Sequence, residues 1–163
     1  QGTIVVMRLP LEPVSLTHHK TADNAALLEM SKGAVEKIDL AGVRVLVVDD
    51  DADSLEIVST ILQNCNSEVQ IAANAQEALN VLNQWEPDIL ISDIQMPGGD
   101  GYELIQQIRR QKPTLRGRIA AVALTAYSRA EDRLKALASG FHTHLSKPID
   151  PKELVAVVTR LVT

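Results

Sequence analysis

Hydrophobic positions follow two alternating periods from Val43 to the end of the chain. The segment "VRVLVV" (residues 43–48) is a mostly β-branched run interrupted by Arg44, and a second apolar run covers residues 89–91. Such runs are typical of strands that are buried on both faces. Between them, in residues 52–65, apolar side chains recur at the three- and four-residue spacing of an amphipathic helix. The pattern predicts alternating strands and helices.

The same reading extends over the rest of this region. Strands are expected at residues 43–48, 68–72, 88–92, 119–125 and 142–146. Helices are expected at residues 52–65, 74–85, 102–110, 130–139 and 151–162. Short connections between such units imply right-handed crossovers and a parallel sheet covered by helices on both faces. The predicted fold class is α/β, a doubly wound five-stranded parallel sheet with the strand order 2-1-3-4-5.

The first part of the chain lacks this alternation. Residues 1–11 read as one strand that ends at a proline, and residues 12–41 are a mixed polar stretch with little periodicity. We therefore expect a remnant strand at 1–11, a linker at 12–41 and one compact domain at 42–163.

Composition narrows the class of protein. Hydrophobic residues make up 45% and charged residues 23% of the chain, as in soluble globular proteins. The net charge of −5 argues against a general affinity for nucleic acid or anionic lipid. The sequence has no apolar run long enough to span a bilayer, its first residues lack the basic and apolar regions expected of a signal peptide, and Cys65 is its only cysteine. These features predict a cytoplasmic protein without a nucleic-acid partner or membrane contact.

Polar residues follow four of the predicted strands. Asp49 and Asp50 come after the first strand, Asp93 after the third, Thr125 ends the fourth and Lys147 follows the fifth. In open α/β sheets, ligands bind beyond the carboxyl ends of the strands, near the point where the strand order reverses. Because strands 1 and 3 are neighbours in the expected order, the three aspartates should lie together.

Clustered carboxylates need a compensating charge. Two of them about 5 Å apart repel each other by about 3 kcal/mol at an effective dielectric constant near 20. A divalent cation removes this penalty, and oxygen ligands favour Mg²⁺ or Mn²⁺ over zinc. With Lys147 and Thr125 facing the phosphoryl oxygens, Asp93 would be the nucleophile that forms an acyl phosphate. Each residue alone could be a turn or helix cap, but the ordered set favours phosphoryl transfer.

Four motifs carry a resemblance to a known family. The segments "VRVLVVDDDADS", "PDILISDIQMPGGDGYEL", "AAVALTAYS" and "GFHTHLSKPID" resemble the motifs of a two-component receiver (response-regulator) domain, which has a flavodoxin-like fold. The resemblance covers residues 43–162. It implies that Asp93 is the phosphorylated residue, and that Mg²⁺ is held by Asp49, Asp50, Asp93 and the backbone carbonyl of Gln95.

The resemblance also assigns a switch and partners. Thr125 matches the switch hydroxyl, and Lys147 matches the conserved lysine, with a cis bond to Pro148. His144 stands where the family usually has Tyr or Phe, so the switch would be polar or weak. The implied partner is a histidine kinase or a histidine phosphotransfer domain, and a homodimer is a further expectation. The domain would catalyse no turnover beyond gaining and losing its own phosphoryl group.

A shorter resemblance lies at the N-terminus. The segment "QGTIVVMRLPLEP" resembles the last strand of a histidine-kinase ATP-binding domain. It implies that the chain is the C-terminal receiver of a hybrid sensor histidine kinase. The alternative is an arbitrary strand with no such origin.

Two other functions fit part of the pattern. A haloacid-dehalogenase-like phosphatase also uses an aspartyl phosphate, and its Asp-x-Asp pattern matches Asp49 and Asp51, but the Gly-Thr that should follow is absent. Hydrolysis of a generic phosphate ester would support it. A pseudo-receiver would act as a binding module without phosphorylation, which the complete set around Asp93 argues against.

Overall fold

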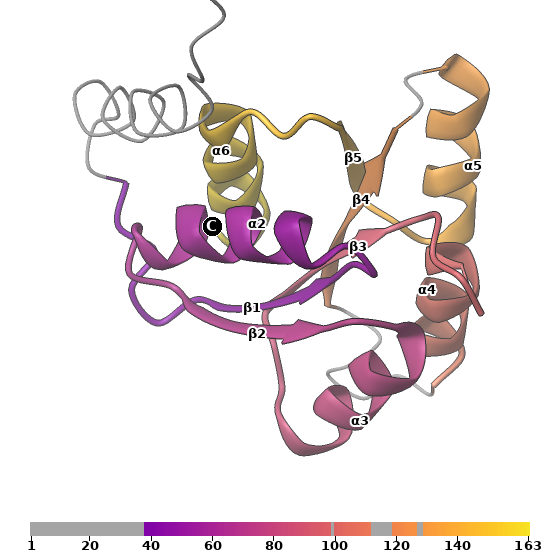
Figure 1. The fold of residues 1–163 in the computed structure, drawn as a ribbon, viewed down its shortest axis with the longest axis horizontal. Helices are drawn as coiled ribbons and strands as arrows, with labels where there is room; N and C mark the ends of the chain where they lie inside the picture. The colour runs from indigo at the N-terminus through magenta and orange to yellow at the C-terminus, as the bar shows by residue number, and fades with distance from the viewer. Residues whose placement is uncertain (1–37, 99, 112–118, 127–128) are drawn as a thin grey trace, which may run out of the picture. The chain divides into compact units, whose positions relative to one another are not determined.

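The domain is built on one parallel sheet. The structure is a computed structural model that describes residues 38–98, 100–111, 119–126 and 129–163. Five strands pair in the order β2-β1-β3-β4-β5, and every pair is parallel (Figure 1). The strands are β1 (Arg44–Val48), β2 (Glu68–Ala72), β3 (Ile89–Asp93), β4 (Ala120–Thr125) and β5 (Thr143–Ser146). The predicted doubly wound sheet is confirmed.

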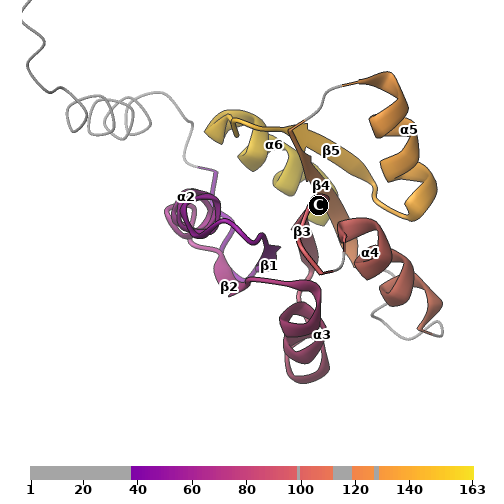
Figure 2. The same ribbon diagram turned by 45° about the vertical axis from the view of Figure 1, so that its right-hand side comes forward.

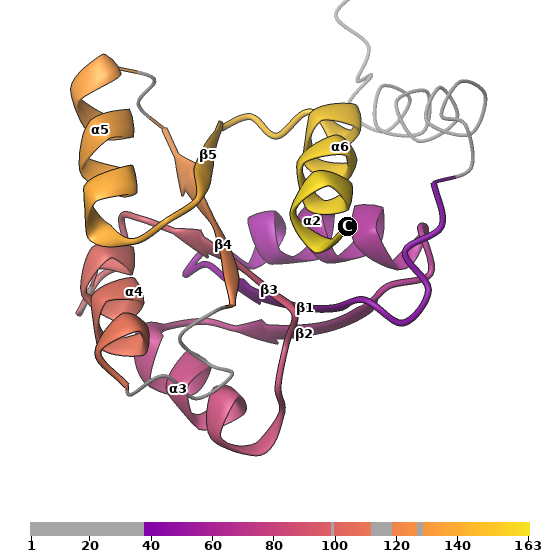
Figure 3. The same cartoon turned by 180° about the vertical axis from the view of Figure 1, so that it is seen from behind.

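Helices cover both faces of the sheet. They are α2 (Ala52–Gln63), α3 (Ala75–Gln84), α4 (Gly101–Arg110), α5 (Ala130–Ser139) and α6 (Pro151–Val162). Helices α2 and α6 pack on one face, and α3, α4 and α5 lie on the other, as the turned view shows (Figure 2). The view from behind shows the same two helical layers on either side of the sheet (Figure 3). Among the described residues, no helix has the length and apolarity needed to cross a membrane.

Burial follows the hydrophobic pattern. Every residue of β3 and β4 is buried, because helices cover both faces of these central strands. The edge strand β2 is different, with Ala72 its only buried residue. Two apolar clusters result, one on each side of the sheet. The side chains that end β1, β3 and β4 are therefore held by a rigid frame.

Polar caps define the ends of the helices. The Asp100 carboxylate accepts a hydrogen bond from the N–H of Glu103 at 2.8 Å, and α4 begins directly after it. Gly140 ends α5 with a φ of 117°, in the left-handed region that favours glycine. Helix α5 ends at Ser139, as predicted, and α4 begins one residue before its predicted start at residue 102. Helix α2 is shorter than predicted: it ends at Gln63, because Asn64 caps it and Asn66 turns the chain with a φ of 65°.

The predicted remnant at residues 1–11 and residues 12–37 of the predicted linker lie outside the described residues. Leu40, near the end of the predicted linker, is buried in the cluster on the α2 and α6 side. Its N–H donates to the carbonyl of Cys65 at 2.7 Å. The packed part of the chain therefore includes this residue.

Candidate functional site

The polar site lies at the carboxyl ends of β1, β3, β4 and β5. Asp49 directly follows β1, Asp93 is the last residue of β3, and Thr125 is the last residue of β4. Strands β1 and β3 are paired so that Val48 lies opposite Ser92, which places Asp49 and Asp93 at the same level. Parallel pairing thus brings together the strand ends that the sequence predicted to meet.

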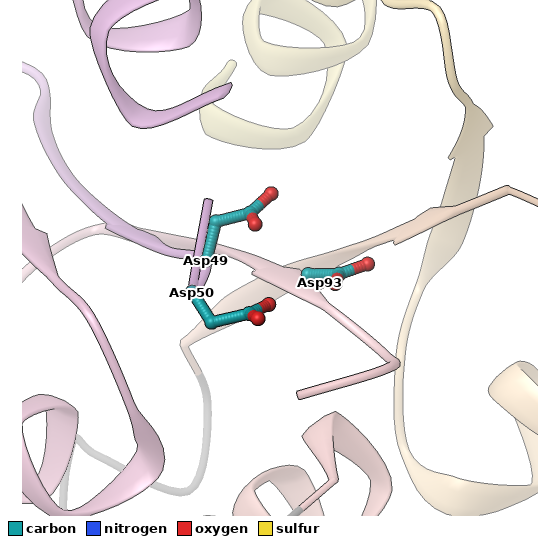
Figure 4. Close-up of side chains that lie close together, drawn as sticks. All are labelled: Asp49, Asp50 and Asp93. Carbon is teal, nitrogen blue, oxygen red and sulfur yellow. The ribbon is translucent and has the colours of Figure 1, made fainter. Parts of the chain in front are cut away.

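Three carboxylates converge there. One oxygen each of Asp49, Asp50 and Asp93 lies within 4.8 Å of the others (Figure 4). Asp49 is 1% exposed and Asp93 is 5% exposed, whereas Asp50 faces solvent. This arrangement concentrates negative charge at a partly buried point that remains open on the Asp50 side.

Lys147 supplies the compensating charge within the chain. Its Nζ lies 2.7 Å from Oδ2 of Asp49 and 3.5 Å from Oδ1 of Asp93. The N–H of Lys147 donates to the carbonyl of Thr125 at 2.8 Å, and the bond to Pro148 is cis, as predicted. Burial alone would lower the pKa of Lys147, but its hydrogen bond to Asp49 and the charge of Asp93 raise it overall. The lysine therefore stays charged in the site.

Burial and a neighbouring charge act on Asp93 itself. Burial is the main reason that its pKa lies above the usual range, and the negative charge of Asp49 adds to the effect. Lys147 and the backbone N–H of Gln95 oppose this shift. The ionised form of Asp93 is thus poorly stabilised by the chain alone, which favours a cation or a covalent modification at this carboxylate.

The loop after β3 presents Asp93 by close packing. The N–H of Ile94 donates to Leu124 at 3.1 Å, and the N–H of Gly101 donates back to Ile94 at 2.9 Å. A Cβ on Gly101 would lie 2.2 Å from the carbonyl oxygen of Asp93. Only glycine allows α4 to begin this close to the reactive residue, a requirement that the sequence analysis did not identify. The only signal was a glycine directly before a predicted helix.

The remaining predicted residues lie around the same site. Thr125 is buried at the end of β4, and Gln95 is exposed in the loop after Asp93. His144 is half-buried and pairs with Ala123, which places it on the same face of the sheet as Thr125. Their positions are those expected. The ligand role of the Gln95 carbonyl and the switch roles of Thr125 and His144 stay predictions.

Asp51 has a different role from the one a haloacid-dehalogenase-like site would require. Its side chain caps α2, accepting hydrogen bonds from the N–H of Asp53 at 3.3 Å and from Oγ of Ser54 at 2.9 Å. It is exposed and does not join the carboxylate cluster. The Asp-x-Asp match is therefore explained by a helix cap.

His142 lies just before β5 and contacts β4. Its Nδ1 accepts a hydrogen bond from the N–H of Ala121 at 3.0 Å, and an Nη2 of Arg109 lies 3.4 Å away. Burial, together with the charge of Arg109, lowers the pKa of His142 below its usual 6.5. The folded domain therefore favours the neutral imidazole.

This contact predicts a pH-dependent stability. Below about pH 6.5 the unfolded chain binds the His142 proton more readily than the folded chain, so His142 destabilises the fold as the pH falls. Between about pH 7.5 and about pH 5, we expect the free energy of unfolding of wild type to fall relative to that of His142→Asn. The change should be less than about 1 kcal/mol, because solvent screens a partly exposed group. Urea unfolding over this range measures it. A constant difference would contradict the prediction.

Comparisons with known proteins agree with this site. The family model of the response regulator receiver domain matches residues 45–159. An uncharacterized 14.6 kDa protein of Leptolyngbya boryana is 46% identical over 121 residues, which are 73% of this chain and 89% of that protein. The phosphate regulon transcriptional regulatory protein PhoB of Escherichia coli (strain K12) is 37% identical over 113 residues, 69% of this chain and 48% of PhoB. The chain thus spans about half the length of PhoB.

A solved structure gives the same result. The signal receiver domain of a signal transduction histidine kinase from Syntrophus aciditrophicus superposes with a TM-score of 0.67 at 31% identity, covering 74% of this chain and 90% of that one. The sheet order, the acidic cluster at the ends of β1 and β3, and the family match over most of the chain all point the same way. The chain belongs to the response regulator receiver domain family.

Proposed function

We propose that Asp93 accepts a phosphoryl group from a phosphohistidine, with Mg²⁺ held by Asp49, Asp50, Asp93 and the carbonyl of Gln95. A carboxylate oxygen of Asp93 forms a bond to phosphorus while the bond from phosphorus to the histidine nitrogen breaks, and the leaving imidazole keeps the electron pair of that bond. The observation that carries the proposal is the convergence of three carboxylate oxygens within 4.8 Å, with the Lys147 ammonium 3.5 Å from Asp93.

The residues present fit a hard divalent cation. The converging atoms are all carboxylate oxygens, which Mg²⁺ prefers, and the exposed Asp50 leaves room for water ligands. Bound there, Mg²⁺ would offset negative charge on the carboxylates and the phosphoryl oxygens. Lys147 would neutralise a further oxygen, and Thr125, at the adjacent strand end, would donate its hydroxyl.

The consequence of transfer is a shift between two conformations. An acyl phosphate on Asp93 attracts Lys147 and Thr125, and the loops after β4 and β5 follow them. His144 lies on the same face of the sheet as Thr125 and would report the change at the edge strand. The phosphorylated domain would thus present a different surface to its next partner.

The donor would be a histidine kinase or a histidine phosphotransfer domain in the cytoplasm. The resemblance at residues 1–11 supports a hybrid sensor kinase as the parent protein, and so does the receiver domain of a histidine kinase among the related structures. PhoB is a transcriptional regulatory protein. The absence of a nucleic-acid partner for this chain therefore stays a prediction. A homodimer is likewise still a proposal.

Intact-mass analysis after incubation with Mg²⁺ and acetyl phosphate tests the acceptor. We expect wild type to gain one phosphoryl group and Asp93→Asn to gain none. The matched control is Asp88→Asn, which changes an exposed aspartate just before the opposite end of β3 and should react like wild type. If wild type stays unmodified while it is folded and binds Mg²⁺, the pseudo-receiver is the better description.

A further inference from the structure

Helix α5 is only lightly packed against the rest of the domain. Of its residues, Ala136 is the buried one, while Leu134 is 66% exposed and Leu137 is 42% exposed. Burial of apolar surface is the main force that fixes a helix to its domain, so α5 gains little from this source. Its position must depend on a few specific contacts.

Two of these contacts come from the neighbouring helix α4. Near the C-terminal end of α4, the Arg109 guanidinium donates to the carbonyl of Gly140 from Nε at 3.1 Å and from Nη2 at 2.9 Å. Near the N-terminal end, the Nζ of Lys135 lies 4.4 Å from the centroid of the Tyr102 ring. The two helices are neighbours in the views of Figures 1 and 2. Arg109 thus holds the C-terminal cap of α5, and Lys135 ties its middle to the start of α4.

The Lys135 contact lies beside the proposed phosphorylation site. A cavity of about 460 Å³ separates the loop after β3 from α5, and its lining includes Gln95, Met96, Tyr102, Thr125, Asp132 and Lys135. Tyr102 is buried, and burial raises the pKa of its phenol, with the charges of Asp132 and Asp100 adding to the effect. The negative charges of Asp132 and Asp100 near the ring also attract the lysine ammonium, in addition to the attraction of the ring itself.

The chain connects this contact directly to Thr125. Residues 126–129 alone join Thr125, at the end of β4, to Ala130, at the start of α5. If a displacement of Thr125 toward a phosphoryl group on Asp93 is passed along the chain to α5, it acts first on the N-terminal half of that helix. Lys135 lies on this helix and reaches back to Tyr102 on α4, so such a movement of α5 would stretch or break their contact.

We propose that Lys135 and Tyr102 form a latch that holds α5 and Thr125 in the resting position, and so slows phosphorylation of Asp93. The inference rests on the proposed function. It makes Lys135 and Tyr102 positioning residues, since neither needs to touch the reacting atoms. Removing either partner should lower the energy needed to move Thr125 and increase the rate of phosphorylation by about three- to tenfold, as expected for loss of a partly buried cation–π contact.

The rate of phosphorylation by acetyl phosphate with Mg²⁺ tests the latch. Lys135→Met and Tyr102→Leu should each react faster than wild type, and the double variant should react no faster than the single variants, because they remove the same contact. Lys135→Arg keeps the cation and Tyr102→Phe keeps the ring, so both should retain the wild-type rate. Arg133→Met is the matched control, because it removes another positive charge from an exposed position on α5.

The outcomes separate the two proposals. A wild type that gains no phosphoryl group refutes the proposed function and the latch with it. A phosphorylated wild type whose Lys135→Met variant reacts at the same rate, or more slowly, refutes the latch alone. An increase shared by Arg133→Met also refutes it, since the effect would then come from net charge. Thermal unfolding of each variant, measured in parallel, confirms that the compared proteins are folded.

Discussion

Replacing Gly101 with alanine is expected to destabilise the domain by about 3 kcal/mol and to abolish phosphorylation of Asp93. The added methyl group would lie 2.2 Å from the carbonyl oxygen of Asp93 and 3.0 Å from the Cα of Ile94. Both neighbours are backbone atoms, so no flexible side chain can move aside. Either α4 or the end of β3 must shift.

A shift at this place reaches the site directly. The N–H of Gly101 donates to the carbonyl of Ile94 at 2.9 Å, and the N–H of Ile94 donates to the carbonyl of Leu124 in β4. Moving α4 outward breaks the first bond, and moving Asp93 separates its carboxylate from Lys147, which lies 3.5 Å away. Transfer requires the reacting groups to be held closely, so the variant should lose phosphorylation even where it remains folded.

Thermal unfolding and intact-mass analysis measure the two effects. We expect the unfolding temperature of Gly101→Ala to fall by about 10 °C or more. Gly42→Ala is the matched control: Gly42 has a φ of 81°, but a Cβ there meets no atom within 4 Å. It should lose only about 1 kcal/mol, through the left-handed backbone, and should be phosphorylated normally. Equal losses in the two variants would show that the close approach of Gly101 has no special role.

The sheet and the acidic cluster were predictable because both follow from local pattern and simple topology. Continuous apolar runs mark β1 and β3 as strands buried on both faces, and the structure buries all of β3. Parallel pairing then brings Asp49 and Asp93 to one edge, whatever the details of side-chain packing. The prediction needed no knowledge of distances.

Contacts between distant segments were not predictable in the same way. The sequence analysis assigned Lys147 to phosphoryl oxygens, and the structure places its Nζ 2.7 Å from Oδ2 of Asp49. Similarly, no periodicity places Lys135 over Tyr102, because the contact depends on how two helices lie side by side. Such details require the three-dimensional packing.

The start of β5 differs by one residue from the predicted start. The strand predicted at residues 142–146 includes His142, but β5 begins at Thr143. His142 precedes the strand and accepts a hydrogen bond from the N–H of Ala121 at 3.0 Å. The backbone N–H of His142 donates to the carbonyl of Ala121 at 2.8 Å, so this residue contacts β4 through its backbone and its side chain although β5 begins one residue later.

Lys147→Met is expected to destabilise the domain by about 3 kcal/mol when Mg²⁺ is absent. Lys147 is the cation that contacts both Asp49 and Asp93, and the side chains of these aspartates are only 1% and 7% exposed. Methionine keeps much of the length of the side chain but leaves two buried carboxylates facing each other. Since the unfolded chain solvates these charges, their repulsion acts against the folded state alone.

The pH dependence of this loss has a definite sign. Burial already raises the pKa of Asp93, and Lys147 opposes the shift, so its removal should raise that pKa further. The folded variant then binds a proton more readily than the unfolded chain, and its stability falls as the pH rises through the unfolded pKa toward neutrality. The destabilisation by Lys147→Met should therefore be smaller at about pH 4, where an aspartate ordinarily begins to bind its proton, than at about pH 7.

Added Mg²⁺ should recover much of the stability that Lys147→Met loses, and more than it adds to wild type. In wild type the cation must enter beside the Lys147 ammonium, whereas in the variant it meets carboxylates whose charge is uncompensated, so it should bind more tightly and stabilise the fold further. Urea unfolding of each protein with Mg²⁺ or with a chelator measures the stability that the substitution removes and the stability that Mg²⁺ restores. Arg44→Met is the control, because it removes an exposed ion pair of 3.5 Å with Asp88 and should cost less than about 1 kcal/mol, with no dependence on Mg²⁺. If the two variants lose the same stability, the lysine does not offset the buried charge. If Mg²⁺ stabilises Lys147→Met no more than wild type, loss of the lysine does not make the carboxylates bind the cation more tightly, and the prediction is wrong.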